Sequence, residues 1–365
     1  MPKELPKLYV ILAADTEDNQ PSYVPGWWRY GSDYDSNPLK LRFDWLRYLD
    51  LLWNCFDIDD IRFKVTWFLR TDPTVGDRCL NALSDLIDRA QEARDELAIH
   101  IHTLRLDERM RWIQCLNQDT CRSTISESIN IFKTSMGTFP KSARMGWNYM
   151  SNSIMQQLEN NGVSYDASCI PGIRSQLMYG QRDNFYDWSK SPCRPFHPSY
   201  DDYQVPGTMK ILEIPVSTYE NVDRNERNVF PNWLRTASGL RRLTSVGATA
   251  SEFPLISTAR RFMFRNDFLI FSPWRNSADV SLLLSSKLSE SLLNCWSYVL
   301  GYFHPSELLN PLSGKPNLAY LRNLRFALSK IVELQNIIEV VPITLFDFGH
   351  AFQEDMLREG EHGTL

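Results

Sequence analysis

Three carboxylates stand at the end of the first apolar run of the chain. The run Leu8–Ala14 contains seven apolar residues without a break, and Asp15, Glu17 and Asp18 follow it directly. A short apolar run rich in Val, Ile and Tyr is typical of a strand that is buried on both faces. In α/β folds, ligands and catalytic groups collect at the carboxyl ends of such strands. The cluster therefore indicates a catalytic or binding site, and the alternative is a solvated acidic turn.

A pair of histidines ends another expected strand. His100 and His102 lie in the run Leu97–Thr103 and are two positions apart, so a regular strand places both side chains on one face. Two imidazoles on one face at a strand end suit a transition-metal site. A single histidine in an apolar run is more often a hydrogen-bonded core residue, but the pair favours a metal or catalytic role.

Further polar groups occur at the ends of later expected strands. Arg144 lies in the segment Phe139–Trp147, Asp166 follows Val163, and His304 follows the apolar run that ends at Phe303. Arg144 could pair with a carboxylate of the first strand, which would lower the pKa of that carboxylate. The alternative for Arg144 is a surface ion pair.

Strands and helices alternate about seven times along the chain, which favours either a parallel α/β barrel or a doubly wound sheet. In a barrel the polar strand ends would converge on one mouth, whereas a doubly wound sheet would spread them along an edge. Helical spacing of apolar residues is clear in several segments, among them 41–56, 80–93, 281–300 and 318–334.

Length and composition limit the possible classes of protein. The chain has 365 residues, 43% of them hydrophobic, and a net charge of −5. These values support a sizeable core, and the lack of a basic stripe argues against nucleic acid as a partner. The leucine-rich segment 281–300 contains Lys287 and Glu290, so we expect a core helix and no membrane span.

The seven cysteines are scattered and form no CxxC pair, which argues against a disulfide framework or a zinc knuckle. The N-terminal residues 1–7 show no apolar signal region and no small-residue cleavage site. Both observations predict a cytoplasmic location.

The order and spacing of these motifs resemble the polysaccharide deacetylase family, carbohydrate esterase family 4. The resemblance covers roughly residues 7 to 352 and rests on five motifs taken together. These are Asp15-Thr16-Glu17-Asp18, Glu96 to His102, Arg144-Met145-Gly146-Trp147, Tyr165-Asp166-Ala167-Ser168, and Tyr302 to Glu307. The resemblance implies a distorted (β/α) barrel of seven or eight strands that forms a single catalytic domain over residues 1–365.

The resemblance also implies roles for individual residues. Asp15 would be the general base, Arg144 would orient it, and His304 would be the general acid. The metal ligands would be Asp18, His100 and His102.

Two departures from the family pattern leave alternatives open. The usual histidine motif is His-x-x-x-His, but position 104 is Leu104, so the second imidazole ligand is either His102 in a shifted geometry or missing. The two acidic residues of the usual family motif are adjacent in sequence, whereas here Glu17 and Asp18 compete for the ligand role.

The activity implied by the resemblance is hydrolysis of an N-acyl group, with N-acetyl expected, from an amino sugar. The expected cofactor is a divalent metal, with Zn²⁺ as the expected ion. A cytoplasmic substrate would be nucleotide-, lipid- or polymer-linked, on the way to a surface polysaccharide. The rival functions are hydrolysis of a non-sugar amide by the same fold, and a degenerate carbohydrate-binding module without catalysis. No motif indicates an oligomeric state.

Two segments without periodicity are expected to cover the mouth of the barrel as insertions. They span about residues 170–205 and 221–272 and are rich in polar residues. The aromatic loop Val24–Tyr30 could wall a groove for a sugar ring or form a small satellite core.

Overall fold

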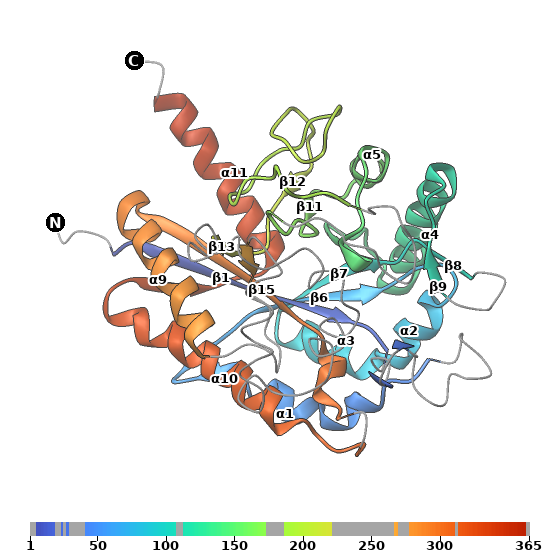
Figure 1. Ribbon diagram of the computed structural model, residues 1–365, viewed down its shortest axis with the longest axis horizontal. Coiled ribbons are helices and arrows are strands. Elements are labelled where there is room, and N and C mark those ends of the chain that lie inside the picture. Colours follow the sequence, from blue (N-terminus) through green and yellow to red (C-terminus); the bar gives the residue numbers. More distant parts are fainter. Residues whose placement is uncertain are drawn as a thin grey trace, which may run out of the picture.

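The structure is a computed structural model. Its central element is one curled parallel sheet, around which the helices are arranged (Figure 1). The structure describes residues 5–18, 23–24, 27–28, 41–106, 112–172, 186–220, 266–268, 277–310 and 313–362. The strand order is β12-β11-β10-β7-β6-β1-β15, and β16 also pairs with β1. The strands of this sheet are β1 (Lys7–Thr16), β6 (Val65–Arg70), β7 (Glu96–Ile101), β10 (Ser142–Met145), β11 (Tyr165–Asp166), β12 (Leu212–Glu213), β15 (Trp296–Phe303) and β16 (Glu339–Pro342).

The first strand lies at the centre of the sheet. From Lys7 to Ala14, β1 pairs with β15, while its first residues pair with β16 and its last residues with β6. All these pairings are parallel, so the strands share one direction and their carboxyl ends meet at one edge. The uninterrupted apolar run of β1 is explained by burial on both faces.

The segment after β12 brings the far edge of the sheet close to β15. Ser217 donates its backbone N–H to the carbonyl of Leu300 at 3.0 Å and accepts from the Leu300 N–H on Oγ at 2.9 Å. The hydroxyl of Tyr298 donates to the carbonyl of Pro215 at 3.0 Å. The sheet is therefore curled into a half-barrel, which confirms the predicted distorted α/β barrel class and excludes a flat doubly wound sheet.

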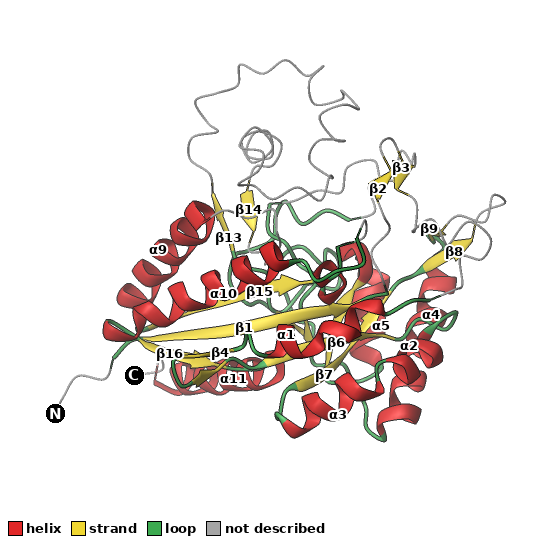
Figure 2. Ribbon diagram, turned by 90° about the horizontal axis from the view of Figure 1, so that it is seen from below, coloured by secondary structure: helices red, strands yellow, loops and turns green. Residues whose placement is uncertain are grey.

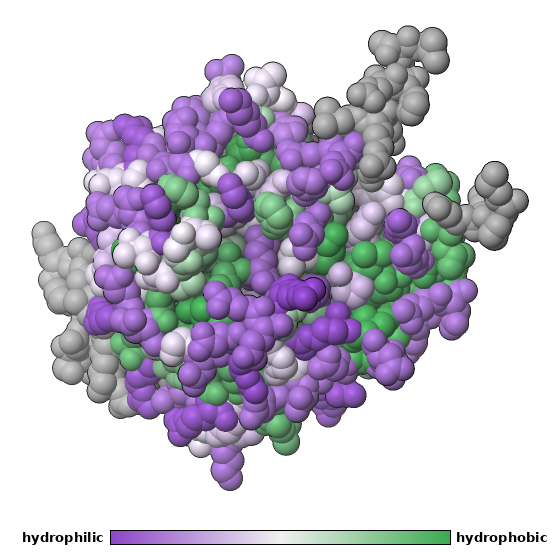
Figure 3. Space-filling view, turned by 180° about the vertical axis from the view of Figure 1, so that it is seen from behind, coloured by the Kyte–Doolittle hydropathy of each residue, from purple (hydrophilic) through white to green (hydrophobic). Residues whose placement is uncertain are grey.

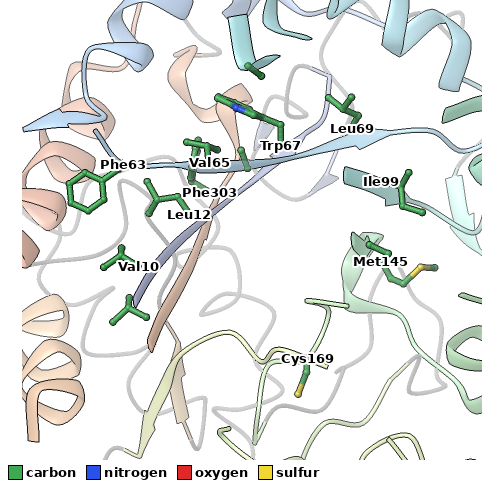
Figure 4. Close-up of a cluster of buried hydrophobic side chains, with 14 of the residues drawn as sticks. Val10, Leu12, Phe63, Val65, Trp67, Leu69, Ile99, Met145, Cys169 and Phe303 are labelled. Atoms are coloured by element: carbon green, nitrogen blue, oxygen red, sulfur yellow. The ribbon is translucent and has the colours of Figure 1, made fainter. Parts of the chain in front are cut away.

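Side chains alternate between the two faces of the sheet, and each face has its own apolar core. Inside the curl lie Ile11, Ala13, Phe68, Ala98 and Leu300, all buried. The outer face carries the intervening residues, including Val10, Leu12, Val65, Trp67 and Phe303, which form one cluster (Figure 4). Burying such side chains supplies the main driving force for folding.

Helices cover the outer face of the sheet (Figures 1 and 2). Asn117 caps α4 by accepting from the Thr120 N–H at 2.9 Å, and Gly137 ends it with a φ of 73°. The helices are α1 (Leu49–Trp53), α2 (Gly76–Ala82), α3 (Ser84–Glu92), α4 (Gln118–Met136), α5 (Asn152–Asn160), α9 (Ser277–Asn294), α10 (Leu318–Val332) and α11 (Leu345–His362). Short 3₁₀ helices are η2 (Asp44–Tyr48), η3 (Gly146–Asn148), η5 (Pro305–Leu308) and η6 (Glu333–Asn336).

The last helix closes the inside of the barrel at the amino ends of the strands. Leu345 and Phe348 of α11 belong to the inner cluster, and Phe348 packs edge-on against Tyr9 with ring centroids 5.6 Å apart. The opposite end, where the strands finish, is the end at which the polar motifs stand. The interior of the barrel is thus filled with apolar side chains at the amino ends of the strands, and the candidate functional residues lie at the carboxyl ends.

Within the described ranges, four two-stranded sheets lie outside the main sheet. They are β2 (Tyr23–Val24) with β3 (Trp27–Trp28), β4 (Asp57–Ile58) with β5 (Ile61–Arg62), β8 (Leu104–Leu106) with β9 (Trp112–Gln114), and β13 (Thr218–Glu220) with β14 (Asn266–Phe268). Most of the predicted insertion 221–272 and part of the predicted insertion 170–205 lie outside the described residues. So do the side chains of the aromatic loop 24–30. The insertions therefore stay predictions.

The face seen in Figure 3 is hydrophilic over most of its described area, with separate hydrophobic patches between the polar residues. Among the described helices, none combines the length and the apolar character that crossing a membrane requires.

Candidate metal and acid–base site

Strand alternation brings the polar motifs to one side of the sheet. Asp15 continues the inward positions of Ile11 and Ala13 on β1, and His100 continues that of Ala98 on β7. Arg144 is the register partner of His100 on the neighbouring strand β10. The resulting group lies inside the curl at the carboxyl ends of the strands.

Three of these side chains meet at one point. Glu17 Oε1 lies 2.7 Å from His102 Nε2 and 3.2 Å from His100 Nε2, and the two imidazole nitrogens are 3.1 Å apart. Within the described part of the chain, this is the cluster of His, Cys, Asp and Glu side chains close enough to hold a metal ion. Two imidazoles and one carboxylate leave further coordination positions open, as in catalytic zinc sites.

The hydrogen bond on the other side of His100 tests whether the cluster fits a cation. His100 Nδ1 lies 3.0 Å from the carbonyl oxygen of Arg144, which can only accept, so Nδ1 carries the proton. In the neutral ring, Nε2 then presents a lone pair toward Glu17 and His102. An imidazole held by a backbone carbonyl in this way is the usual arrangement of a metal-binding histidine. The donor atoms therefore fit a divalent cation.

The electrostatics of the cluster agree with this assignment. Burial by itself would raise the pKa of Glu17, but the charge of His102 and the hydrogen bonds with His100 and His102 outweigh it and hold the pKa well below its usual value. Burial lowers the pKa of His102, and the charge of Glu17 offsets only part of that effect. The lowered pKa of Glu17 favours an ionised carboxylate, which is the form that binds a metal.

The expected carboxylate ligand Asp18 is placed elsewhere. Its Oδ1 lies 3.5 Å from Arg70 Nη1, and the residue that completes the cluster with the two histidines is Glu17. The physical reason is the end of β1: the Glu17 N–H bonds to the carbonyl of Asp15 at 3.0 Å, and this turn directs Glu17 toward β7. His102 completes the cluster although position 104 holds Leu104, the first residue of β8.

The segment after Arg144 supports His102 from behind. A Cβ added to Gly146 would lie 2.4 Å from Cγ of the His102 ring, so only glycine leaves room for this ring. Trp147 meets the same ring edge-on at 5.9 Å between centroids. Trp147 and Asn148 both adopt a φ of 55°, a strained left-handed conformation for residues other than glycine. Such strain is found where the surroundings fix a functional geometry.

A second polar group lies beside the metal cluster. Arg144 Nε donates to Asp15 Oδ2 at 3.0 Å, and His304 Nε2 lies 3.7 Å from the same oxygen. Asp15 Oδ1 and His304 Nδ1 are buried and have no hydrogen-bond partner among the described residues. The structure thus brings together Asp15, Arg144 and His304, the three residues that the sequence assigned to catalysis.

Arg144 is held on every side. Its guanidinium donates to the carbonyl of Ala167 and to Oδ1 of Asn148, and it lies over the ring of Tyr302 at 4.2 Å. Burial would lower the pKa of Arg144, but the negative charge of Asp15 leads a group of contributions that raise it. The side chain is therefore a permanent cation fixed against Asp15, as expected from its place in the motif.

Asp166, another strand-end residue, forms part of the structural support. Both of its carboxylate oxygens accept from Ser168, at 3.1 Å from the backbone N–H and 3.0 Å from the hydroxyl. Burial raises the pKa of Asp166 and that of its register neighbour Glu213. Ser168 also accepts from the Met145 N–H at 2.8 Å, so this group fixes the end of β10 next to Arg144.

Sequence reasoning left Glu17 open, named Gly146 only as part of the Arg144 motif without a role, and missed Arg70 and Asn148. For Glu17 a signal existed, because it lies two positions after Asp15 and so shares its face if the strand alternation continues. For Arg70, which follows the inward positions of β6, the same alternation would have placed it at the mouth. No sequence signal identified Asn148.

No protein-family model matches the chain, and none of the curated proteins matches it in sequence. Solved structures similar to it include one described as a putative polysaccharide deacetylase from Mycobacterium smegmatis. That structure is 13% identical, covers 98% of this chain and 93% of its own, and gives a TM-score of 0.48.

A probable polysaccharide deacetylase from Pseudomonas aeruginosa is 11% identical. The match covers 95% of this chain and 90% of that protein, with a TM-score of 0.45. A family 4 carbohydrate esterase from Streptomyces lividans is 14% identical. The match covers 45% of this chain and 64% of that protein, with a TM-score of 0.27. At these identities the likeness is one of fold, so function has to be argued from the residues of the site.

Proposed function

We propose that this protein is a metal-dependent hydrolase that removes an N-acyl group, with N-acetyl as the expected group, from an amino sugar. The observation that carries the proposal is the meeting of Glu17 Oε1 with the Nε2 atoms of His100 and His102. It stands beside an aspartate that is held by Arg144 and approached by His304. The choice of an amino sugar rests on the resemblance of the five motifs.

Glu17, His100 and His102 would hold the metal. A divalent cation bound by these groups would polarise an acyl carbonyl and lower the pKa of a coordinated water. Zn²⁺ is the proposed ion, because imidazole and carboxylate ligands with open positions suit it. The carbonyl of Arg144 fixes the His100 ring, and the backbone at Gly146 fixes the His102 ring.

Asp15 would act as the general base through Oδ1, the oxygen that has no partner among the described residues, while Oδ2 stays bound to Arg144. A base fixed by one oxygen and free at the other is oriented before the proton arrives. His304 would donate a proton to the departing amine. Its ring lies 3.7 Å from Asp15, so one small group at the mouth can contact both.

The finer parts of the proposal concern the setting. The substrate would be a nucleotide-, lipid- or polymer-linked amino sugar in surface polysaccharide biosynthesis, handled in the cytoplasm. Purified protein tests the activity: acetate release from an N-acetylated amino sugar is measured with the metal removed and with Zn²⁺ restored.

We expect about one bound metal per chain, activity that depends on it, and loss of both in Glu17→Gln and His100→Ala. A protein that binds metal but releases no acetate from any N-acylated sugar would support a binding module or a non-sugar amidohydrolase instead.

A further inference from the structure

A buried cluster of charges lies next to the proposed metal site. Arg70, the last residue of β6, donates from Nε to Asp72 Oδ1 at 2.8 Å and from Nη2 to Asp72 Oδ2 at 3.4 Å. Its third nitrogen, Nη1, lies 3.5 Å from Asp18 Oδ1. The three side chains are 7%, 4% and 5% exposed for Arg70, Asp72 and Asp18. We call Asp18, Arg70 and Asp72 the acidic clamp.

The acidic clamp is connected to the proposed metal site by one sequence neighbour and by one pair of residues on adjacent strands. Asp18 is the residue next to Glu17, and Arg70 is the register partner of His100 on the adjacent strand. Glu17 itself is fixed through its backbone, because its N–H bonds to the carbonyl of Asp15 and its carbonyl accepts from Trp45 Nε1 at 3.1 Å. Its side chain direction therefore depends on how the chain is held at Asp18.

We infer that the acidic clamp is a positioning device that selects Glu17, and not Asp18, as the carboxylate ligand of the metal site. Asp18 and Arg70 are then positioning residues that act through Glu17. This inference rests on the proposed function, since it concerns the same metal site.

The selection follows from charge and geometry. Two adjacent carboxylates at the end of β1 could both enter the coordination sphere of a divalent cation. Asp72 takes two of the donors of Arg70 and orients its planar guanidinium so that the third nitrogen faces Asp18. A buried guanidinium needs anionic partners, so Asp18 is kept at Arg70 and away from the histidines.

The clamp also sets the local charge. With Asp18 neutralised by Arg70, a cation at the histidines meets the single negative charge of Glu17 and two neutral imidazoles. Arg144 compensates the charge of Asp15 in the same way. The acidic residues of the first motif thus face different groups: Asp15 faces Arg144, Glu17 faces the histidine pair, and Asp18 faces Arg70.

The test is a titration of metal-free protein with Co²⁺, read from its visible absorption, which reports affinity and coordination without any assay of activity. We expect Glu17→Gln to abolish the Co²⁺ spectrum, because a ligand is lost. Asp18→Asn should weaken Co²⁺ binding by about 10–100-fold, the usual effect of removing a group that orients a ligand. The saturated spectrum of Asp18→Asn should keep the shape of the parent spectrum, because the ligands are unchanged.

Two further variants separate positioning from folding. Arg70→Lys keeps a cation beside Asp18 and should bind Co²⁺ more tightly than Arg70→Gln, with thermal unfolding of each metal-free variant measured in parallel. Asp119→Asn is the matched control, because Asp119 forms an exposed ion pair with Arg122 far from the clamp in the sequence. It should bind Co²⁺ like the parent.

The outcomes distinguish the two proposals. A parent that binds no Co²⁺ overturns the metal site of the proposed function and the clamp with it. A parent that binds Co²⁺ while Asp18→Asn binds equally well overturns the clamp alone. If Asp18→Asn abolishes the spectrum and Glu17→Gln keeps it, Asp18 is the ligand and the inferred selection is wrong.

Discussion

Glu17 and Glu96 are both glutamates of the barrel interior, at its two opposite ends. Glu96 begins β7, four positions before His100 on the same face of the same strand. Its Oε2 accepts from Thr66 Oγ1 and from the Phe346 N–H, each at 2.9 Å. Burial raises the pKa of Glu96 to about 7, because the hydrogen bonds that Glu96 accepts offset only part of the burial effect and the charge of Asp347 adds to it.

Glu17 meets the reverse conditions at the mouth. Burial alone would raise its pKa, but the charge of His102 and the hydrogen bonds of His100 and His102 hold the pKa well below the usual value. Near pH 7 the same side chain is thus ionised at one end of the barrel and only about half ionised at the other. The difference shows that the partners, more than burial, decide the charge state. At the mouth the charge of Glu17 serves the proposed chemistry. At the amino ends of the strands, the carboxyl of Glu96 links β7 to α11 by accepting the Phe346 N–H.

The largest expected effect at the mouth concerns the acid–base pair. Asp15→Asn and His304→Ala should each lower kcat by at least about 100-fold, because each removes a proton-transfer group. Neither side chain belongs to the Glu17, His100 and His102 cluster, so bound metal should stay near the parent level. Acetate release and metal content are measured on the same samples. Unchanged kcat in both variants would contradict the assigned roles.

An intermediate effect should follow from adding one methyl group behind His102. In Gly146→Ala the new Cβ would press on the imidazole ring, so we expect metal affinity to fall roughly 10–100-fold. Gly137→Ala is the control: its Cβ would meet nothing within 4 Å, although its φ of 73° strains the backbone. That variant should lose about 1 kcal/mol of stability and keep its metal affinity. Equal affinities in the two variants would break the link between Gly146 and His102.

The smallest effect is expected at Glu96, at the amino ends of the strands. The folded pKa of Glu96, about 7, lies above the ordinary value of about 4.5 for a glutamate. Its stabilising contribution is therefore complete below pH ~4.5 and is lost as the pH rises through about 7. The shift corresponds to at most about 3 kcal/mol, and the partial exposure of the residue reduces this to about 1–2 kcal/mol.

Glu96→Gln should remove this loss. Urea unfolding at pH 5 and pH 8 should show the parent losing about 1–2 kcal/mol of unfolding free energy relative to the variant. A parent and a variant with the same pH dependence would mean that Glu96 is already ionised, and that the two ends of the barrel do not differ.

The barrel class could be predicted from the sequence because β1, β7 and β15 each contain a short apolar run with a polar group at or just after the end of the strand. The same reasoning nominated Asp15, Arg144 and His304, which the structure brings together. It could not choose between Glu17 and Asp18, because the choice depends on the turn after Thr16 and on Arg70, which comes from a different strand. Residue type and spacing do not contain that tertiary contact.

The sequence also could not predict which backbone conformations hold the site residues in place. Asn148 holds Arg144 while its own backbone adopts a left-handed conformation, a geometry imposed by the packing around it. The closure of the barrel through Ser217 and Leu300 depends on two strands distant in the sequence. The roles of all these residues stay predictions until the experiments above are made.

The pairing of β1 with both β6 and β15 has a consequence for the order in which the protein matures on the ribosome. Glu17, His100 and His102 are all present in the first third of the nascent chain, and β1, β6 and β7 can pair as soon as they emerge. The other edge of β1 stays unpaired until β15 is synthesised, near the end of the chain. His304 therefore joins Asp15 last, so the cluster of Glu17, His100 and His102 can form before Asp15 and His304 meet. In the interval an apolar strand edge is exposed, which makes the nascent chain a natural client for chaperones.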